Sequence, residues 1–374
     1  MTSMSKTVQR TALITAGGTG GHIFPGLAIA QALRDAGWQV HWAGGRGSLG
    51  QPSMESQLIP PQGFAFETID FSGVRGKGVL TLLAMPVRLL RACWQSLGML
   101  RRIRPDVVAG MGGYISFPIG LMSALLRTPL ILHEQNSVAG MANKILARFS
   151  TKVYTAFPAA FSGLKPKAHW VGNPLRSDFV GLPDPSVRYG SRRGPLRLLV
   201  LGGSLGAKTL NDVVPRALAL MPAENRPVVT HQSGQKNIEE LQANYAAVAV
   251  QAELKPFIDN IAQSLAETDL VICRAGASTV TEIAALGVAA VFVPLPSAVD
   301  DHQTTNAKFL VEQGGGWIVR QQDLTPERLA RMLQKADRIT LMKTAINARA
   351  MAKLGATEHL VAACASICAK RPRA

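Results

Sequence analysis

The sequence predicts an α/β chain of two doubly wound domains, each with a parallel sheet covered by helices. Short apolar runs rich in β-branched residues alternate with helical segments along the whole chain, which is typical of repeated βαβ units. A strand, a glycine-rich loop and a helix occur together twice, as ALITAGGTGGHIFPGLAIAQAL near the N terminus and as LRLLVLGGSLGAKTLNDVVPRAL after residue 195. A Pro-, Gly- and Arg-rich stretch over residues 181–195 separates the two copies, and 374 residues suit two domains.

In the first half, residues 11–16 predict a strand, residues 26–37 a helix that ends at Gly37, and residues 38–44 the next strand. Three more strands follow within residues 105–114, 129–136 and 151–157, and each ends in a polar or glycine-rich loop. Parallel strands all end at the same edge of a sheet, so these loops are where a ligand site is expected.

In the second half, residues 227–234, 269–287 and 289–296 continue the pattern. A final helix from about residue 341 has no strand after it and is expected to pack on the first domain. The predicted domains are therefore 1–175, joined by about 345–374, and 176–344. We expect two Rossmann-like domains.

The N-terminal residues MTSMSKTVQR carry no apolar core of a secretory signal, and no run approaches the roughly 18 apolar residues of a membrane-spanning helix. The chain is therefore expected to be soluble. The four cysteines form no CxxC pair and are expected to be reduced, without a metal.

A formal net charge of +16 indicates an anionic partner, such as nucleic acid, a membrane surface or a phosphorylated substrate. Aromatic residues are few and no nucleic-acid-binding motif is present, so nucleic acid is not expected. An idle basic surface is the alternative explanation for many of these charges.

Both glycine loops are candidate phosphate cradles, because glycine lets backbone amides approach a ligand at the start of a helix. GGTGGHIF does not fit the dinucleotide fingerprint, since Ile23 stands where its last glycine belongs, and Ala207 before Lys208 breaks a P-loop. In GASTVTE, small residues open a helix and Glu282 follows one turn later, where it could bind a ribose. A simple helix cap is the alternative for that segment.

Together these segments resemble the MurG family, the cell-wall transferases that move N-acetylglucosamine from its UDP carrier to lipid I. The segments that carry the resemblance, in order along nearly the whole chain, are AGGTGGHIFPGLAIA, FSGVRGKG, PDVVAGMGGYISFP, HEQNSVAGMANK, VGNPLR, LGGSLGAKTLN, FIDN, CRAGASTVTEIAALG and DDHQTTNA.

The resemblance implies a GT-B fold, in which two Rossmann-like domains face a cleft and the C-terminal one holds most of UDP-N-acetylglucosamine (UDP-GlcNAc). Glu282 would bind the ribose, Ile258 the uracil and Gln303 the sugar hydroxyls. The remaining positions that match donor-binding residues of the family are Thr19, Gly20, Gly21, Asn136, Arg176, Ser204, Ala277, Ser278, Thr279, Val280 and Thr281.

The implied reaction inverts the anomeric carbon and needs a base for the 4-hydroxyl of the muramyl sugar. His22 is the first candidate because an imidazole titrates near neutral pH. Helix capping or phosphate binding is the alternative role for His22, and Glu134 and His133 are the reserve candidates. No Asp-X-Asp occurs in the sequence, so no metal cofactor is expected; a magnesium ion chelated by the substrate is left open.

Lipid I is anchored in a membrane, which predicts a peripheral enzyme on the cytoplasmic face of the inner membrane. The segment of residues 74–94 mixes apolar and basic side chains and is the candidate docking patch. Its members are Arg75, Lys77, Val79, Leu82, Leu83, Val87, Arg88, Leu90 and Arg91. An ordinary core helix with snorkelling arginines is the alternative.

Two other functions stay open from the sequence. One is a GT-B transferase that uses a UDP-sugar with a different acceptor. The other is a regulator that binds UDP-sugar without catalysis. Other proteins of cell-wall synthesis or division are candidate partners in either case.

Overall fold

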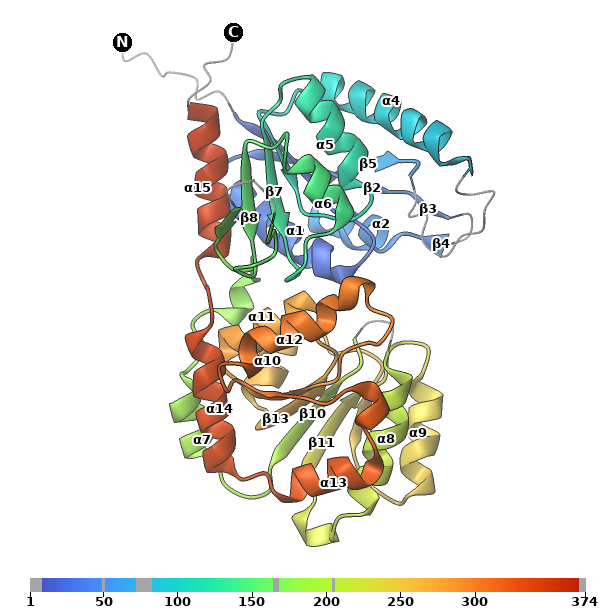
Figure 1. Cartoon of the computed structure of the whole chain (residues 1–374), viewed down its shortest axis with the longest axis vertical. Helices are drawn as coiled ribbons and strands as arrows, with labels where there is room; N and C mark the ends of the chain where they lie inside the picture. The colour runs from blue at the N-terminus through green and yellow to red at the C-terminus, as the bar shows by residue number, and fades with distance from the viewer. Residues whose placement is uncertain (1–8, 49–50, 72–82, 164–167, 204–205, 370–374) are drawn as a thin grey trace. The chain divides into compact units, whose positions relative to one another are not determined.

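The computed structural model describes residues 9–48, 51–71, 83–163, 168–203 and 206–369. The chain divides into two compact units, unit 1 with Met1–Arg176 and Leu354–Ala374, and unit 2 with Ser177–Lys353. Each unit is an α/β domain with a parallel sheet (Figure 1).

Unit 1 has a seven-stranded sheet in the order β5-β2-β1-β6-β7-β8-β9, and all its pairs are parallel. Strand β1 is buried over its whole length because helices cover both faces of the sheet. The strands are β1 Thr11–Thr15, β2 Gln39–Gly45, β5 Ala65–Ile69, β6 Val107–Gly110, β7 Leu130–Glu134, β8 Lys152–Thr155 and β9 Ala168–Trp170, beside a hairpin of β3 Gly47–Ser48 and β4 Gln51–Pro52. The helices are α1 Gly20–Asp35, α2 Met54–Leu58, α4 Met85–Ile103, α5 Ser116–Leu125, α6 Met141–Leu146 and α15 Ala356–Ala369.

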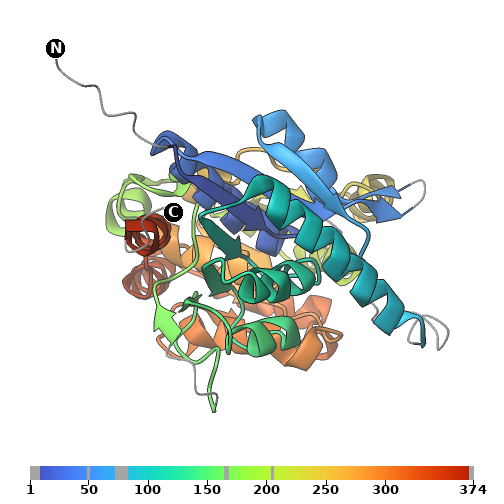
Figure 2. The same cartoon turned by 90° about the horizontal axis from the view of Figure 1, so that it is seen from above.

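The two faces of the unit 1 sheet form separate cores because successive side chains of a strand point to opposite sides. Ala12 and Ile14 of β1 pack in one core with α1 and α15, whereas Leu13 packs in the other with α4, α5 and α6. Figure 2 shows the long helix α4 in teal across the outside of this second layer.

Unit 2 repeats the plan with a six-stranded sheet in the order β12-β11-β10-β13-β14-β15. Its strands are β10 Arg197–Leu201, β11 Val228–Gln232, β12 Glu253–Lys255, β13 Leu270–Cys273, β14 Ala289–Phe292 and β15 Trp317–Ile318. Its helices are α7 Pro185–Ser191, α8 Lys208–Ala219, α9 Ile238–Ala247, α10 Ile261–Ala266, α11 Ala277–Leu286, α12 His302–Val311, α13 Pro326–Gln334 and α14 Arg338–Ala350.

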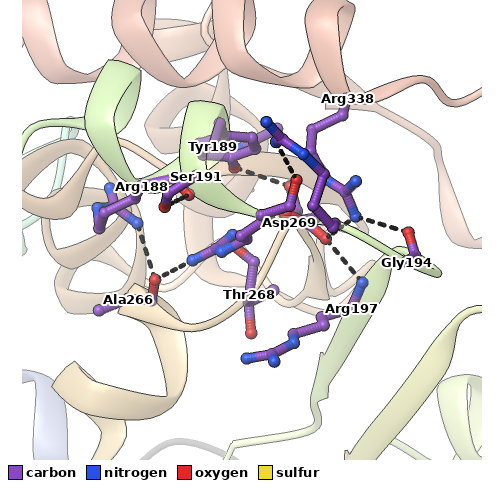
Figure 3. Close-up of polar contacts among 12 residues, drawn as sticks. Arg188, Tyr189, Ser191, Gly194, Arg197, Ala266, Thr268, Asp269 and Arg338 are labelled. Carbon is purple, nitrogen blue, oxygen red and sulfur yellow. Dashed lines mark hydrogen bonds and ion pairs between the residues drawn. The ribbon is translucent and has the colours of Figure 1, made fainter.

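Residues 181–195, which have the composition of a linker, contain helix α7 and fold as part of unit 2. Asp184 caps helix α7 by accepting from the Ser186 amide. The buried Arg188 donates to the carbonyl of Ala266 at the end of α10, at 3.1 Å (Figure 3). It also donates to the carbonyl of Gly287 at the end of α11, at 2.7 Å. A polar sequence is thus held by carbonyls that the helix ends leave unsatisfied.

The C-terminal segment forms two helices where the sequence suggested one. Helix α14 belongs to unit 2, where it packs on α7 and α11. Helix α15 belongs to unit 1 and packs on α1, with the buried Leu360 and Ile367 in the core (Figure 1).

Candidate functional sites

The candidate residues follow the carboxyl ends of the central strands in each sheet. In unit 1, β1 lies between β2 and β6, and the loops after β1, β6 and β7 carry the glycine loop, Gly112–Tyr114 and Gln135–Asn136. In unit 2, β10 lies between β11 and β13, and the loops after β10 and β13 carry the second glycine loop and Arg274–Gly276. Each group therefore lies where strand order reverses, the usual ligand position in such sheets.

The first glycine loop leads directly into α1, which begins at Gly20 rather than at the predicted residue 26, so that His22 belongs to the helix and Pro25 lies within it. Thr19 is the N-cap residue, and its carbonyl accepts from the amides of His22 at 3.1 Å and Ile23 at 3.2 Å. Gly20 and Gly21 form the first turn, where amides have no acceptor within the helix. The Thr19 side chain is exposed and caps nothing, so it is available to a ligand.

A buried carboxylate beneath this loop was missed from the sequence. Glu55 of α2 has no exposed surface, and it accepts from the amides of Gly45 at 3.0 Å and Gly18 at 3.3 Å. The Gly18 amide is therefore already engaged, and the candidate donors of this loop are the residues after it, Thr19, Gly20 and Gly21. The only sequence signal was an acidic residue two positions after the Ser53 cap, which is an ordinary helix start.

His22 lies in the first turn of α1, half-buried, with its Nδ1 2.8 Å from Oε1 of Gln135. Nε2 of Gln135 is 3.0 Å from Nδ1 of His133, and Nε2 of His133 is 2.9 Å from the Gly172 carbonyl oxygen. Burial lowers the pKa of His133 to about 4. The structure thus joins the candidate base and the reserve candidate His133 through Gln135, a residue that sequence reasoning passed over.

The other reserve candidate, Glu134, has both carboxylate oxygens occupied. Oε1 accepts from the Asn136 amide at 3.0 Å, and Oε2 accepts from the Gly140 amide at 3.0 Å and Asn143 Nδ2 at 2.9 Å. The side chain is 2% exposed. These contacts fix the loop that carries Asn136, which makes His22 the stronger candidate for a base.

Arg176 supplies a cation near the first glycine loop. Its guanidinium carbon lies 5.6 Å from the ring centre of Phe24, and a Cβ at Gly20 would be 3.0 Å from that same ring. An always-charged guanidinium is suited to an anionic group such as a diphosphate.

In unit 2, helix α11 begins at Ala277 after the N-cap Gly276. Ala277, Ser278 and Thr279 lie in its first turn, with Val280 and Thr281 directly after them. The Oγ atom of Ser278 is buried and has no hydrogen-bond partner among the described residues. Free amides, a helix dipole and an unused hydroxyl together suit an anionic ligand.

Side chains of the next helix hold the loop in front of α11. Gln303 Oε1 accepts from the amides of Ala275 at 3.2 Å and Leu295 at 3.0 Å, and Asn306 Nδ2 donates to the Ala275 carbonyl at 3.1 Å. Because the oxygen of Gln303 is engaged, only its amino group remains for a ligand, as a donor. Glu282 lies in the second turn of α11 and is half-buried.

The remaining candidates of unit 2 lie on other loops. Ile258 is 6% exposed, in the loop between β12 and α10, and its neighbour Phe257 is 47% exposed. Ser204, together with Leu205, lies outside the described residues.

The candidate docking patch is only partly described. Arg75, Lys77, Val79 and Leu82 lie outside the described residues, whereas Leu83, Val87 and Leu90 are exposed by 73%, 69% and 65%. Trp94, which the sequence-based list left out, is 77% exposed and continues the same spacing on one side of α4. Arg88 and Arg91 are exposed beside them. No helix of the described part is long and apolar enough to cross a bilayer.

Comparisons with known proteins match nearly the whole chain. The glycosyltransferase family 28 N-terminal domain matches residues 12–155, and the family 28 C-terminal domain matches residues 197–364.

Two relatives carry the same name, UDP-N-acetylglucosamine–N-acetylmuramyl-(pentapeptide) pyrophosphoryl-undecaprenol N-acetylglucosamine transferase. The protein from Albidiferax ferrireducens is 67% identical over 357 residues, 96% of this chain and 91% of the relative. The protein from Ralstonia nicotianae is 55% identical over 374 residues, 99% of each chain. The crystal structure of Acinetobacter baumannii MurG is similar with a TM-score of 0.81 and 40% identity, covering 96% of this chain and 99% of that one.

Proposed function

The chain belongs to the MurG family of GT-B glycosyltransferases, and from that premise we propose how its residues move N-acetylglucosamine from UDP-GlcNAc to lipid I, the undecaprenyl-pyrophosphoryl N-acetylmuramyl-pentapeptide. The chain is an N-acetylglucosaminyltransferase of this family. The observation that carries the assignment of roles is the half-buried His22 at the start of α1, next to the glycine loop.

His22 is the general base of the proposal. It removes the proton from the 4-hydroxyl of the muramyl sugar as that oxygen attacks the anomeric carbon of GlcNAc, and the bond to UDP breaks on the opposite side. Such a base contributes roughly 10²–10⁴-fold to the rate. Thr19, Gly20 and Gly21, with Arg176, offer donors and positive charge to a diphosphate next to it.

The donor nucleotide is assigned to unit 2. The amides of Ala277, Ser278 and Thr279 and the Ser278 hydroxyl bind its phosphates, and Val280 and Thr281 line the same helix start, since the Val280 amide already donates to the Gly276 carbonyl. Glu282 accepts from the ribose hydroxyls and Ile258 meets the uracil. Gln303 donates to a hydroxyl of the sugar. Ser204 and Asn136 complete the donor-binding set carried over from the family resemblance.

We assign the charge of the leaving UDP to helix dipoles and arginines, with no resident metal ion. The support is the sequence, which contains no Asp-X-Asp. Transfer should therefore persist in EDTA. Complete loss in EDTA with full recovery on adding Mg²⁺ would instead assign the metal a required role.

The apolar side of α4 is proposed to bind the membrane surface at the cytoplasmic face, where the acceptor lies. Burial of one large apolar side chain contributes about 1.5–3 kcal/mol, and each basic residue near anionic lipid contributes about 1 kcal/mol. Val87, Leu90 and Trp94 of α4, with Leu83 just before it, supply the apolar contact, and Arg88 supplies positive charge beside Arg91, which also pairs with Asp70 at 3.1 Å.

Transfer of labelled GlcNAc to a lipid I analogue tests the proposal, with His22→Ala and Glu282→Ala beside the wild type. We expect His22→Ala to lose transfer by about 10²-fold or more while UDP binding persists. Full activity of His22→Ala would move the base to another residue. A folded wild type that binds UDP-GlcNAc but transfers nothing to lipid I would favour a different acceptor, or a regulator that only binds the nucleotide sugar.

A further inference from the structure

We infer that Gln135 and His133 are positioning residues that fix the protons of His22, so that Nδ1 always carries hydrogen and Nε2 alone accepts the substrate proton. This inference rests on the proposed role of His22 as the base. The backbone carbonyl of Gly172 can only accept a hydrogen bond, and it sets the direction of the three hydrogen bonds that lead from it to His22.

His133 is the buried end of the chain of contacts. His133 has no exposed surface, and its Nε2 is 2.9 Å from the carbonyl oxygen of Gly172. A carbonyl oxygen can only accept, so Nε2 carries the hydrogen. Burial lowers the pKa of His133 to about 4, and the ring is therefore neutral at physiological pH, with an unprotonated Nδ1.

That unprotonated nitrogen orients the next side chain. Nδ1 of His133 needs a donor, and Nε2 of Gln135 lies 3.0 Å from it and also donates to the His133 carbonyl at 3.2 Å. Gln135 is 1% exposed, so its amide group depends on these protein partners for its hydrogen bonds. Its oxygen is consequently left to face His22.

The Gln135 oxygen then determines the tautomer of His22. Oε1 lies 2.8 Å from Nδ1 of His22 and can only accept, so Nδ1–H is required whether the imidazole is neutral or charged. The proton that the ring gains or loses must be the one on Nε2. A base fixed in this tautomer is always ready to accept, which is the role a buried hydrogen-bond partner plays for other catalytic histidines.

Gly112 makes the contact between the two side chains possible. Its φ of +90° lies in the left-handed region, and a Cβ at this position would be 2.9 Å from Nδ1 of His22 and 3.3 Å from Oε1 of Gln135. Any side chain here would enter the hydrogen bond itself. The glycine after β6 therefore provides the space in which His22 and Gln135 meet.

The test combines NMR with kinetics. Two-bond ¹H–¹⁵N spectra of the full chain, recorded about two pH units above the ordinary imidazole pKa, report which nitrogen of each neutral histidine carries hydrogen. His22→Ala and His133→Gln identify the two signals. We expect Nδ1–H for His22 and Nε2–H for His133. An Nε2–H signal for His22 overturns the inference, and this measurement needs no substitution of Gln135.

Gln135→Met keeps the size of the side chain and removes its polar atoms. We expect kcat to fall about ten- to hundred-fold, a part of the contribution of a positioned base, with KM for UDP-GlcNAc unchanged. In a His22→Ala background the same substitution should have no further effect, because Gln135 acts through His22. An equal additional loss in that background would overturn the inference and assign Gln135 a purely structural role.

Gln95→Met is the matched control in the same unit. Gln95 of α4 also makes two polar contacts, with the Asp70 amide at 2.9 Å and carboxylate at 3.1 Å, but lies outside the His22 chain of contacts. Its kcat should match the wild type with a soluble acceptor analogue. If the tautomer is as inferred but His22→Ala transfers at the full rate, the proposed base is wrong while the hydrogen-bonded arrangement stands.

Discussion

Replacement of Asp269 by asparagine should destabilise unit 2 far more than the loss of one negative charge from the surface. The carboxylate has no exposed surface and lies at the start of β13. Its Oδ1 is 2.7 Å from Arg192 Nη1, and its Oδ2 accepts from the Arg197 amide at 2.9 Å and from Arg338 Nη2 at 3.2 Å (Figure 3). It thereby ties together α7, β10 and α14.

The magnitude follows from what Asp269→Asn leaves behind. Arg192 and Arg338 are 12% and 22% exposed, so their charges would stay mostly buried without a counter-charge. Removal of one partner from a buried ion pair costs about 3–5 kcal/mol. The amide would retain one acceptor and turn its NH₂ group toward a donor, so we expect a loss of about 3–5 kcal/mol in the free energy of unfolding. For a unit of about 150–250 residues this lowers Tm by roughly 6–20 °C.

Calorimetry of the full chain measures the loss of unfolding free energy. Hydrogen exchange of peptides from β10 and β13 reports the loss in unit 2 separately from unit 1. Glu240→Gln is the control, because its ion pair with Lys208 is exposed and screened by solvent, so its loss should leave the stability of unit 2 nearly unchanged. A loss below about 1 kcal/mol for Asp269→Asn, or an equal loss of protection in unit 1, would refute the reasoning.

The pH dependence of the free energy of unfolding gives a second check of the role of Asp269. Burial alone would raise the pKa of Asp269, but hydrogen bonds from Arg192, the Arg197 amide and Arg338 outweigh it and hold the pKa below its usual value of 3.8. A lowered carboxyl pKa contributes stability that is complete above the ordinary pKa and is lost as pH falls through the folded one. The difference between wild type and Asp269→Asn should therefore be constant near neutrality and shrink only below about pH 4.

Four further outcomes are expected. Gln303→Glu keeps an acceptor for the Ala275 and Leu295 amides but loses the NH₂ donor. Isothermal titration should therefore show the Kd for UDP-GlcNAc raised about ten-fold, or ~1.4 kcal/mol, and the Kd for UDP unchanged. Equal weakening of both ligands would contradict this. Glu55→Gln places an NH₂ group against a backbone amide of the first glycine loop, which weakens the hydrogen bond. Hydrogen exchange of the backbone amides of residues 17–21, measured by mass spectrometry, should therefore accelerate about ten-fold. Unchanged exchange would show that Glu55 does not hold the loop. Trp94→Ser should weaken sedimentation with anionic vesicles about ten-fold while transfer to a soluble acceptor is retained; unchanged vesicle binding would exclude this side of α4 from the membrane contact. Burial lowers the pKa of His231 to about 3, so stability of unit 2 in urea should fall by up to about 1.4 kcal/mol per pH unit from pH 6.5 toward 3, and His231→Gln should flatten that slope.

The sequence by itself determined the central strands of both sheets and the positions of the loops that follow them. Alternation of apolar strands with amphipathic helices is a local property, and Gly37, with φ +82°, ends α1 where the sequence placed it. The order of motifs carried the family assignment, which the comparisons confirm over nearly the whole chain. Residues 181–195 were harder to interpret, because their composition is that of a linker and only contacts with α10 and α11 make them part of unit 2.

Tertiary structure alone decided which side chains meet at the site. His22 and Gln135 are 113 positions apart, and Gly18 and Glu55 are 37 apart. The first contact depends on the strand order that sets β6 beside β1 and β7 beside β6, and the second depends on β2 lying beside β1. Strand patterns do not encode that order. A buried carboxylate or amide also looks like any surface residue in the sequence, because its partners are backbone groups that every residue carries.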